Sequence, residues 1–331
     1  MPKPHPHELY HYTGIDGLKG IIESQTLWAT HYKYVNDTEE VIHFRDRLPQ
    51  FLRPVFKKIF SGLNPQEQEL VLNDYKSIDM AVEEEPKKLA KIMYNVTFVG
   101  AEKKPPIAEP YITAFCRVDK NNERVTNHGL LSQWRGYGAQ GGYSIIFDAE
   151  GLRQLIQEEA SKWAYSTGFS GDVVYSSATD EEIHDEFGEH IDDLQKSWEQ
   201  ALRTRNPSAL GNTFSRFIAC ACRYKHWGFA EEKEYRIVLP PTSSEIVEVA
   251  QRQGKTILPK PVSFFLRNGT MVPYLNLFEG ITGSSGKRLP IKRIIVGPHP
   301  EKEKRKLAVE KLLSQYKIEA DVSVSAIPYL G

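Results

Sequence analysis

Alternating and helically spaced hydrophobic positions divide the chain into short strands and helices. Alternation predicts strands over residues 9–12, 27–30, 111–116, 143–147, 173–175, 234–239, 291–296 and 322–326. Helical spacing predicts helices over residues 15–22, 150–163, 180–199, 214–221 and 308–316. Strands and helices in this mixture indicate an α+β fold. No linker is long enough to separate two domains, so we expect residues 1–331 to form a single domain.

Helical insertions are expected at about residues 45–95 and 178–227. The first is interrupted by Pro49, Pro54, Pro65 and Pro86, which predicts several short helices instead of long ones. Residues 13–16 match the capping-box pattern, and residues 36–39 resemble a second helix start. The segment 180–199 carries nine carboxylates and one lysine, typical of a solvated helix face, although an acidic partner-binding surface stays open.

Composition narrows the class of protein. The chain has 331 residues, of which 40% are hydrophobic and 26% charged, and its mean hydropathy is −0.45, as in globular proteins. No apolar run reaches about 18 residues, so we expect no membrane contact. A net charge of −1 disfavours a globally basic nucleic-acid binder. The N-terminus does not resemble a secretory signal, and three cysteines suit a reducing cytoplasm, where we expect the protein to act.

The cysteines also bear on metal binding. Cys220 and Cys222, with His226 nearby, invite a zinc interpretation, but the spacing is wrong for a zinc knuckle and no second ligand pair follows. We expect buried thiols and no metal.

Three segments could carry chemistry. In the first, His11 lies between Tyr10 and Tyr12-Thr13 where a predicted strand meets a helix. Such junctions present backbone amides and short side chains to ligands. A lone histidine on a strand is more often structural, and that alternative stays open.

The second segment, residues 130–143, contains a literal G-x-G-x-x-G at Gly136, Gly138 and Gly141. A dinucleotide-binding fingerprint follows a strand and opens a helix, whereas this one runs into a strand, so a Rossmann site is rejected. The segment predicts a flexible loop carrying Trp134, Arg135 and Tyr137. An arginine with two aromatics suits a phosphate-bearing, stackable ligand, but the two rings are equally well explained as hydrophobic anchors.

The third segment is 231–236, where Glu232 and Glu234 point to the same face if the segment is a strand. Two adjacent carboxylates are a common arrangement for acid–base chemistry or for stabilising a cation. The alternative is a solvated edge strand with glutamate–lysine pairing.

The ordered set of motifs resembles one family over nearly the whole chain. The motifs are Tyr-His-Tyr-Thr at 10–13, Leu-Trp-Ala at 27–29, Val-Asn-Asp-Thr-Glu-Glu at 35–40, Leu-Ser-Gln-Trp-Arg-Gly-Tyr-Gly at 131–138, Glu-Lys-Glu-Tyr-Arg at 232–236, Ile-Val-Gly-Pro at 295–298 and Ser-Ala-Ile-Pro-Tyr at 325–329. This arrangement is similar to the bacterial domain of unknown function 2971 family (DUF2971).

A more distant likeness is to ADP-ribosyltransferases, which bind NAD in a cleft of a split, bent mixed or antiparallel sheet. This resemblance implies that His11 contacts the nicotinamide ribose and that the Tyr12-Thr13 backbone contacts the carboxamide. It further implies that Tyr143, or else Tyr137, stacks on the nicotinamide ring and that Arg135 faces the pyrophosphate. Glu234 would be the catalytic carboxylate, with Glu232 orienting the acceptor. Tyr12 stands where many such enzymes carry glycine.

The resemblance implies an NAD-dependent ADP-ribosyltransferase, with NAD as substrate and a protein or nucleic acid as acceptor. Such an enzyme could be an intracellular toxin or phage-defence effector, which leaves open an inhibitory partner protein. Two alternatives remain: a non-catalytic nucleotide-sensing or interaction module, and a metal-dependent nuclease. The enzyme hypothesis requires His11 and Glu234 to share a cleft, and it fails if their side chains lie on opposite faces of the sheet or more than about one NAD length apart.

Overall fold

A ten-stranded mixed sheet organises the computed structural model, which describes residues 7–35, 40–100, 104–137, 141–211, 213–283 and 286–328. Its main path runs β11-β12-β2-β3-β1-β4-β13-β14, and β9 adds to β3 and carries β6. Only the β13–β14 pairing is parallel among the described pairs of this sheet. The strands of this sheet are β1 (Glu8–Thr13), β2 (Leu27–His31), β3 (Tyr111–Cys116), β4 (Tyr143–Asp148), β6 (Phe169–Asp172), β9 (Glu234–Leu239), β11 (Val262–Arg267), β12 (Thr270–Leu277), β13 (Ile291–Val296) and β14 (Asp321–Val324). The α+β class expected from the pattern is confirmed.

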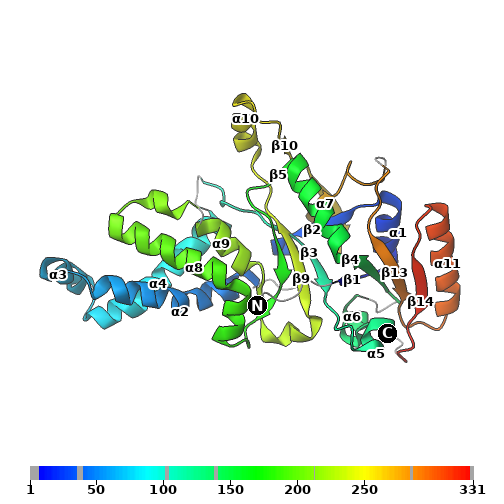
Figure 1. Cartoon of the computed structure of the whole chain (residues 1–331), viewed down its shortest axis with the longest axis horizontal. Helices are drawn as coiled ribbons and strands as arrows, with labels where there is room; N and C mark the ends of the chain where they lie inside the picture. The colour runs from blue at the N-terminus through cyan, green and yellow to red at the C-terminus, as the bar shows by residue number, and fades with distance from the viewer. Residues whose placement is uncertain are drawn as a thin grey trace.

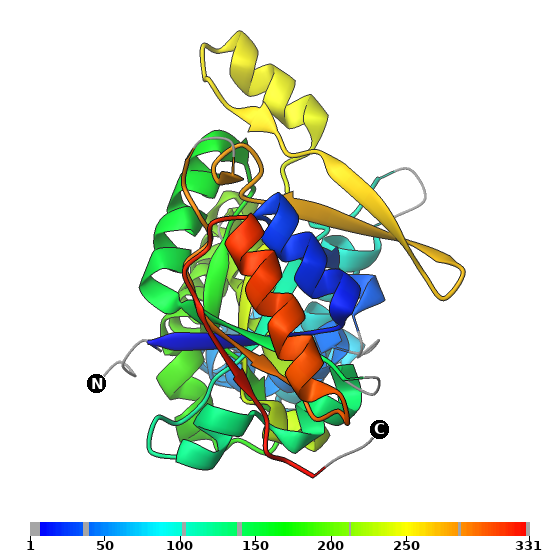
Figure 2. The same ribbon diagram turned by 90° about the vertical axis from the view of Figure 1, so that its right-hand side faces the viewer.

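Helices cover the sheet and extend beyond it. Figure 1 shows α1, α7 and α11 beside the sheet and a helical lobe of α2, α3, α4, α8 and α9 on the opposite side of the molecule. Figure 2 shows α1 next to α11, with α10 and the β11–β12 hairpin projecting from the body. The helices are α1 (Ile15–Ser24), α2 (Glu40–Phe60), α3 (Pro65–Asp74), α4 (Ile78–Tyr94), α5 (Glu123–His128), α6 (Leu131–Tyr137), α7 (Ala149–Lys162), α8 (Asp180–Thr204), α9 (Thr213–Ala221), α10 (Ser244–Arg252) and α11 (Lys302–Gln315). Shorter elements are η1 (Tyr32–Tyr34), η2 (Asn95–Val99), η3 (Pro207–Leu210), η4 (Trp227–Glu232), β5 (Trp163–Ala164), β7 (Val174–Tyr175), β8 (Tyr224–Lys225) and β10 (Leu258–Pro259).

The two helical insertions pack together as one lobe. Phe44 of α2, Phe187 of α8 and Phe217 of α9 are all buried in its apolar core. The helix break expected at Pro65 is confirmed, because α3 begins there, but the breaks expected at Pro49, Pro54 and Pro86 are wrong, because α2 continues through Pro49 and Pro54 and α4 continues through Pro86. Each proline removes one backbone hydrogen bond, but burial of the apolar faces of α2 and α4 stabilises the long helices. The predicted helix start at residues 36–39 lies outside the described residues.

Helix α1 begins without the predicted capping box. Its N-cap is Gly14, and no side chain caps it. Thr13 is still part of β1, and its side chain lies where a Cβ on Gly17 would stand, only 1.9 Å from the Oγ1 atom. Gly17 is therefore required so that the end of β1 can pack directly against the first turn of α1.

The sheet forks at β3. Along one edge of β3, its first residues Tyr111 and Ile112 pair with β2, and its last residue Cys116 pairs with Tyr10 of β1. Strand β9 pairs along the whole of the opposite edge. The carbonyl of Ala114, in the gap between β1 and β2, accepts a hydrogen bond of 3.0 Å from Nδ1 of His11. The fork opens one edge of β3 in the middle of the sheet.

Strand register sorts side chains onto two faces of the sheet. The first face carries the core of Leu9, Phe115 and Ile237, packed under α1, α7 and α11. The second face carries Tyr10, Cys116 and Glu234, which are cross-strand neighbours in the register. The second face is therefore the side on which polar groups and the α6 helix meet.

A buried ion pair joins α7 to the segment around β10 and β12. Nζ of Lys260 lies 2.6 Å from Oε1 of Glu159, and both side chains are fully buried. Glu159 also accepts hydrogen bonds from the Tyr165 hydroxyl (2.7 Å) and the Phe278 amide (2.8 Å), and Lys260 donates to the Asn276 carbonyl (2.7 Å). Removing one partner would leave an unpaired buried charge.

We therefore expect Lys260→Met to lower the free energy of unfolding by about 3–5 kcal/mol. The matched control is Lys287→Met, which removes the exposed pair with Glu158 on the same helix and should cost less than about 1 kcal/mol. Denaturant titration of both variants measures the difference. Equal losses in the two variants would contradict the structural role of the buried pair.

Candidate functional site

A cavity of about 170 Å³ lies in the fork of the sheet, and we call it the fork cavity. Strand β1 contributes Tyr10, His11 and Tyr12 to its wall, and β9 contributes Glu234 and Arg236. The remaining lining residues are Trp28, Thr30, Tyr34, Val35, Ile112, Ala114, Phe115, Cys116, Gln133, Tyr137, Lys225, Glu232 and Arg267. The fork cavity therefore collects side chains from segments far apart in the sequence.

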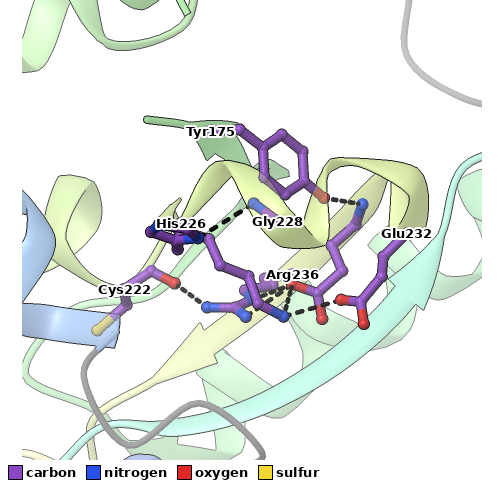
Figure 3. Close-up of polar contacts among 8 residues, drawn as sticks. Tyr175, Cys222, His226, Gly228, Glu232 and Arg236 are labelled. Atoms are coloured by element: carbon purple, nitrogen blue, oxygen red, sulfur yellow. Dashed lines mark hydrogen bonds and ion pairs between the residues drawn. The ribbon is translucent and has the colours of Figure 1, made fainter. Parts of the chain in front are cut away.

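The wall formed by η4 and β9 holds two glutamates and two cations. Oε2 of Glu234 accepts hydrogen bonds from Nε (3.0 Å) and Nη2 (2.6 Å) of Arg236. Nζ of Lys225 lies 2.8 Å from Oε2 of Glu232 and 3.3 Å from Oε2 of Glu234. Nη1 of Arg236 donates to the Cys222 carbonyl at 2.8 Å (Figure 3). The four charges balance, which permits their burial.

The two carboxylates converge, but not by the predicted geometry. Glu232 is the last residue of η4, Lys233 is left-handed with φ of 44°, and β9 starts at Glu234. The expectation that Glu232 and Glu234 share one strand face is therefore wrong. They meet because Lys225 reaches both, and the Glu234 amide is held by the Tyr175 hydroxyl at 2.9 Å.

The two glutamates differ in their electrostatics. Burial, followed by the neighbouring charge of Glu234, raises the pKa of Glu232 above its usual value. Burial alone would raise the pKa of Glu234 as well, but Arg236 and Lys225 outweigh it, so the pKa of Glu234 is lowered. Of the two, Glu234 is thus held more firmly as an anion, and Glu232 takes up a proton more readily.

His11 enters the fork cavity from the other side of the sheet. Strand alternation puts its side chain on the first face, with Leu9, while Glu234 is on the second face. The condition that the two side chains share one face of the sheet is therefore not met. Both residues still line the same cavity, because the sheet is open between β1 and β2 at this point. The imidazole packs against Phe115, with ring centroids 5.6 Å apart. Since Nδ1 donates to the Ala114 carbonyl, Nε2 of the neutral ring is an acceptor.

The residues of α6 have two different roles: one anchors the helix in the apolar core, and another lines the fork cavity. The predicted loop over residues 130–143 is wrong in its first part, because Trp134, Arg135 and Tyr137 lie on the short helix α6; Gly138 lies outside the described residues. Trp134 is 1% exposed, packs edge-on against Tyr12 and donates from Nε1 to the His128 carbonyl, so it is a hydrophobic anchor. Tyr137 lines the cavity, whereas Arg135 is exposed and does not.

Two further predicted contacts lie away from the cavity. Tyr143 is 2% exposed and belongs to the core on the first face, so its predicted role of stacking on a ligand ring is wrong for this geometry. Thr13 pairs with Tyr143 at the end of β1, while the backbone neighbour Tyr12 does line the cavity. Of the two tyrosines considered for ring stacking, Tyr137 is the one at the cavity.

Sequence reasoning missed several residues of the fork cavity. Lys225 and Arg236 are buried cations, and Trp28 and Arg267 come from β2 and the tip of the β11–β12 hairpin. A buried arginine or lysine must be paired with an anion. The two closely spaced glutamates, Glu232 and Glu234, were therefore the sequence signal that could have pointed to buried cations beside them. The hairpin itself carries an Asn268-Gly269 turn, which is a strong hairpin signal.

The cysteines behave as expected for core residues. All three are buried, and burial together with Glu234 and Glu232 raises the pKa of the Cys116 thiol, which stays protonated. Across the described ranges, no cluster of three or more His, Cys, Asp or Glu side chains is arranged to hold a metal ion. In the same ranges, no helix has both the length and the apolarity needed to cross a membrane.

Fold and site together define an α+β protein with a charge-balanced cavity in a forked mixed sheet. Residues 133–237 match the model of the family described as "Protein of unknown function (DUF2971)", which confirms over this range the family that the motifs predict. The matched range includes Tyr137, Lys225 and both glutamates. Searches of the curated proteins and of the solved structures found no match.

Burial lowers the pKa of His11, so the imidazole should stay neutral as the pH falls through the usual value of 6.5. Long-range proton–nitrogen spectra recorded across pH should show an Nδ1-protonated neutral ring at pH 6.5. The His11→Gln variant assigns the signal by its disappearance. A ring already cationic at this pH, or one protonated at Nε2, would contradict the Ala114 hydrogen bond.

Proposed function

We propose that this protein is an NAD-dependent ADP-ribosyltransferase whose reaction takes place in the fork cavity. The observation that carries the proposal is that His11, Tyr137, Glu232 and Glu234, which come from three separate segments of the chain, line one cavity. These four residues supply a hydroxyl-binding imidazole, a ring for stacking and two carboxylates.

The size of the fork cavity fits part of a dinucleotide. Binding sites for whole drug-sized ligands have volumes of about 300–1,000 Å³, and the fork cavity has about 170 Å³. It therefore suits the nicotinamide riboside end of NAD, with the remainder outside. Tyr137 would stack on the nicotinamide ring, and Nε2 of His11 would accept a hydrogen bond from a ribose hydroxyl.

The carboxylates explain how the glycosidic bond could break. When the bond between ribose C1′ and the nicotinamide nitrogen breaks, nicotinamide leaves neutral with the bonding electrons and the ribose becomes cationic. The fixed negative charge of Glu234 would stabilise this cation in a cavity of low dielectric. The acceptor then forms a bond to C1′ and transfers its proton to Glu232, the carboxylate with the raised pKa.

A second cavity offers an approach for the acceptor. This outer groove, of about 660 Å³, has Tyr10 and Glu234 in its wall and so borders the fork cavity. Its charged lining is mixed and includes Arg117, Lys120 and Asp172. A macromolecular acceptor could reach Glu234 from this groove while NAD occupies the fork cavity.

One observation favours a second candidate, a non-catalytic nucleotide-sensing module. The Glu234 carboxylate is held by both Arg236 and Lys225, an arrangement that also serves stability alone. Such a module would bind NAD without cleaving it. Thermal stabilisation by NAD in the absence of nicotinamide release would identify this case.

The first test is release of nicotinamide from NAD by the purified protein, with water or an added acceptor. We expect Glu234→Gln to reduce the rate about 10²–10³-fold because charge stabilisation of the transition state is lost, and Glu232→Gln to reduce it about 10²-fold or more. His11→Ala should also lose activity. The matched control is Glu231→Gln, the exposed neighbour on η4, which should keep the wild-type rate. Wild-type rates in the Glu234 and Glu232 variants would contradict the proposal.

The raised pKa of Glu232 predicts the pH dependence of transfer. A general base must be ionised, so the rate should fall as the pH drops through the pKa of Glu232, which burial and the charge of Glu234 raise above its ordinary value. Glu232→Gln should remove this acid limb while leaving a low, flat rate. A pH profile of kcat/KM for both proteins makes the comparison, and an unchanged acid limb in the variant would assign it to another group.

A further inference from the structure

An aromatic cluster on the second face of the sheet borders the fork cavity. Trp28 of β2 lies 4.3 Å from Tyr274 of β12 and 5.1 Å from Phe265 of β11 between ring centroids. Phe265 and Tyr274 lie 5.7 Å apart, so the three rings form one continuous group, here called the aromatic platform. Trp28 itself lines the fork cavity, and 46% of its surface is exposed. None of the three rings belongs to the buried apolar clusters of the described residues. The apolar core therefore does not account for this aromatic surface beside a polar cavity.

The strand register explains why these rings and Arg267 share a face. Tyr274 pairs with Thr30, two residues from Trp28, and with Ser263, two residues from Phe265. Alternation therefore puts Trp28, Phe265 and Tyr274 on the face of the fork cavity. Arg267, two residues beyond Phe265, is on the same face, at the hairpin tip formed by Asn268 and Gly269.

Arg267 brings a positive charge to this edge of the cavity. Its Nη2 donates to the Tyr34 carbonyl, which fixes the guanidinium beside η1, and both Arg267 and Tyr34 line the fork cavity. A guanidinium has five N–H donors, so one bond to a carbonyl leaves donors for a phosphate. The cavity thus has carboxylates at β9 and an arginine with aromatic rings at β2, β12 and β11.

We propose that the aromatic platform and Arg267 bind the adenosine phosphate half of NAD, with the adenine stacked on Trp28 and a phosphate on Arg267. This inference rests on the proposed function, which puts the nicotinamide riboside end in the fork cavity. The fork cavity is too small for the whole dinucleotide, so the adenosine half must extend beyond it, along the exposed sides of the lining residues Trp28 and Arg267. Trp28 of β2 lines the fork cavity and is 46% exposed, so its ring is within reach of the adenosine half of a dinucleotide whose other end lies in the cavity.

The test uses AMP and nicotinamide mononucleotide as separate probes for the two halves, with binding measured by calorimetry. Trp28→Ala should weaken AMP binding about 10-fold or more, because base stacking on an aromatic side chain is lost. Trp28→Phe should restore most of it, and binding of nicotinamide mononucleotide should change little in either variant. Trp227→Ala, which removes another exposed tryptophan outside the cavity lining, is the matched control and should bind AMP normally.

Arg267 gives an independent readout. Wild-type protein should prefer AMP over adenosine, and Arg267→Gln should remove that preference while leaving adenosine binding intact. Because this residue is exposed at a hairpin tip, the variant tests the proposal even if Trp28→Ala does not fold. AMP affinity that is equal in the wild type, Trp28→Ala and Arg267→Gln would overturn the inference. So would tight binding of single-stranded oligo(dA) with none of AMP, which would assign the platform to nucleic acid.

Failure of the inference is distinguishable from failure of the proposed function. If the wild type releases nicotinamide but Trp28→Ala has the same KM for NAD, the aromatic platform is not the adenosine site, and the proposed enzymatic activity is still supported. If AMP binding depends on Trp28 and Arg267 but no nicotinamide is released, the adenine nucleotide site is supported and the proposed enzymatic activity is contradicted.

Discussion

The burial of Arg236 in the middle of the sheet is the constraint on which the candidate site depends. Its guanidinium is 2% exposed, so it must be paired, and Glu234 two residues away on the same strand face supplies the anion. Lys225 is buried against the same carboxylate and draws Glu232 toward it. Charge pairing that the fold requires therefore also fixes two carboxylates at the wall of a cavity. The same charge pairing in residues 232–236 thus serves both the stability of the fold and the position of the two carboxylates.

The fork in the sheet has a comparable double role. Where β1 and β2 separate, the Ala114 carbonyl would lack a strand partner in the gap, and His11 supplies the hydrogen bond. A buried carbonyl without a partner is costly, which is sufficient reason for a hydrogen-bond donor at this position. The same bond fixes the tautomer of the imidazole and leaves Nε2 as an acceptor. The structural explanation of His11 and its proposed ligand contact are thus compatible, because they use different nitrogens.

Local patterns predicted most of the sheet but little of the site. The alternation at β3, β4, β9 and β13 is strong because one or both faces are buried, and these strands appear as expected. The long helices through Pro49 and Pro86 were missed because packing of the lobe outweighs a local cost. The pairing of Glu232 with Lys225, the fork at Ala114 and the burial of Tyr143 depend on contacts distant in sequence. No local sequence pattern shows which of Tyr143 and Tyr137 lines the cavity. The register of β4 with β1 does, because it puts Tyr143 on the first face of the sheet, in the core.

The positions of the two cavities suggest how one carboxylate could serve two substrates. In a transfer at carbon that inverts the configuration, the nucleophile approaches from the side opposite to the departing group, so a site for such a transfer must be reachable from two sides. The fork cavity and the outer groove are separate spaces, yet both have Tyr10 and Glu234 in their walls. The match to DUF2971 covers the glutamates and Tyr137 but neither His11 nor Trp28. The proposed carboxylate chemistry thus lies within the matched range, and the proposed contacts to both ends of the donor nucleotide also draw on segments outside it.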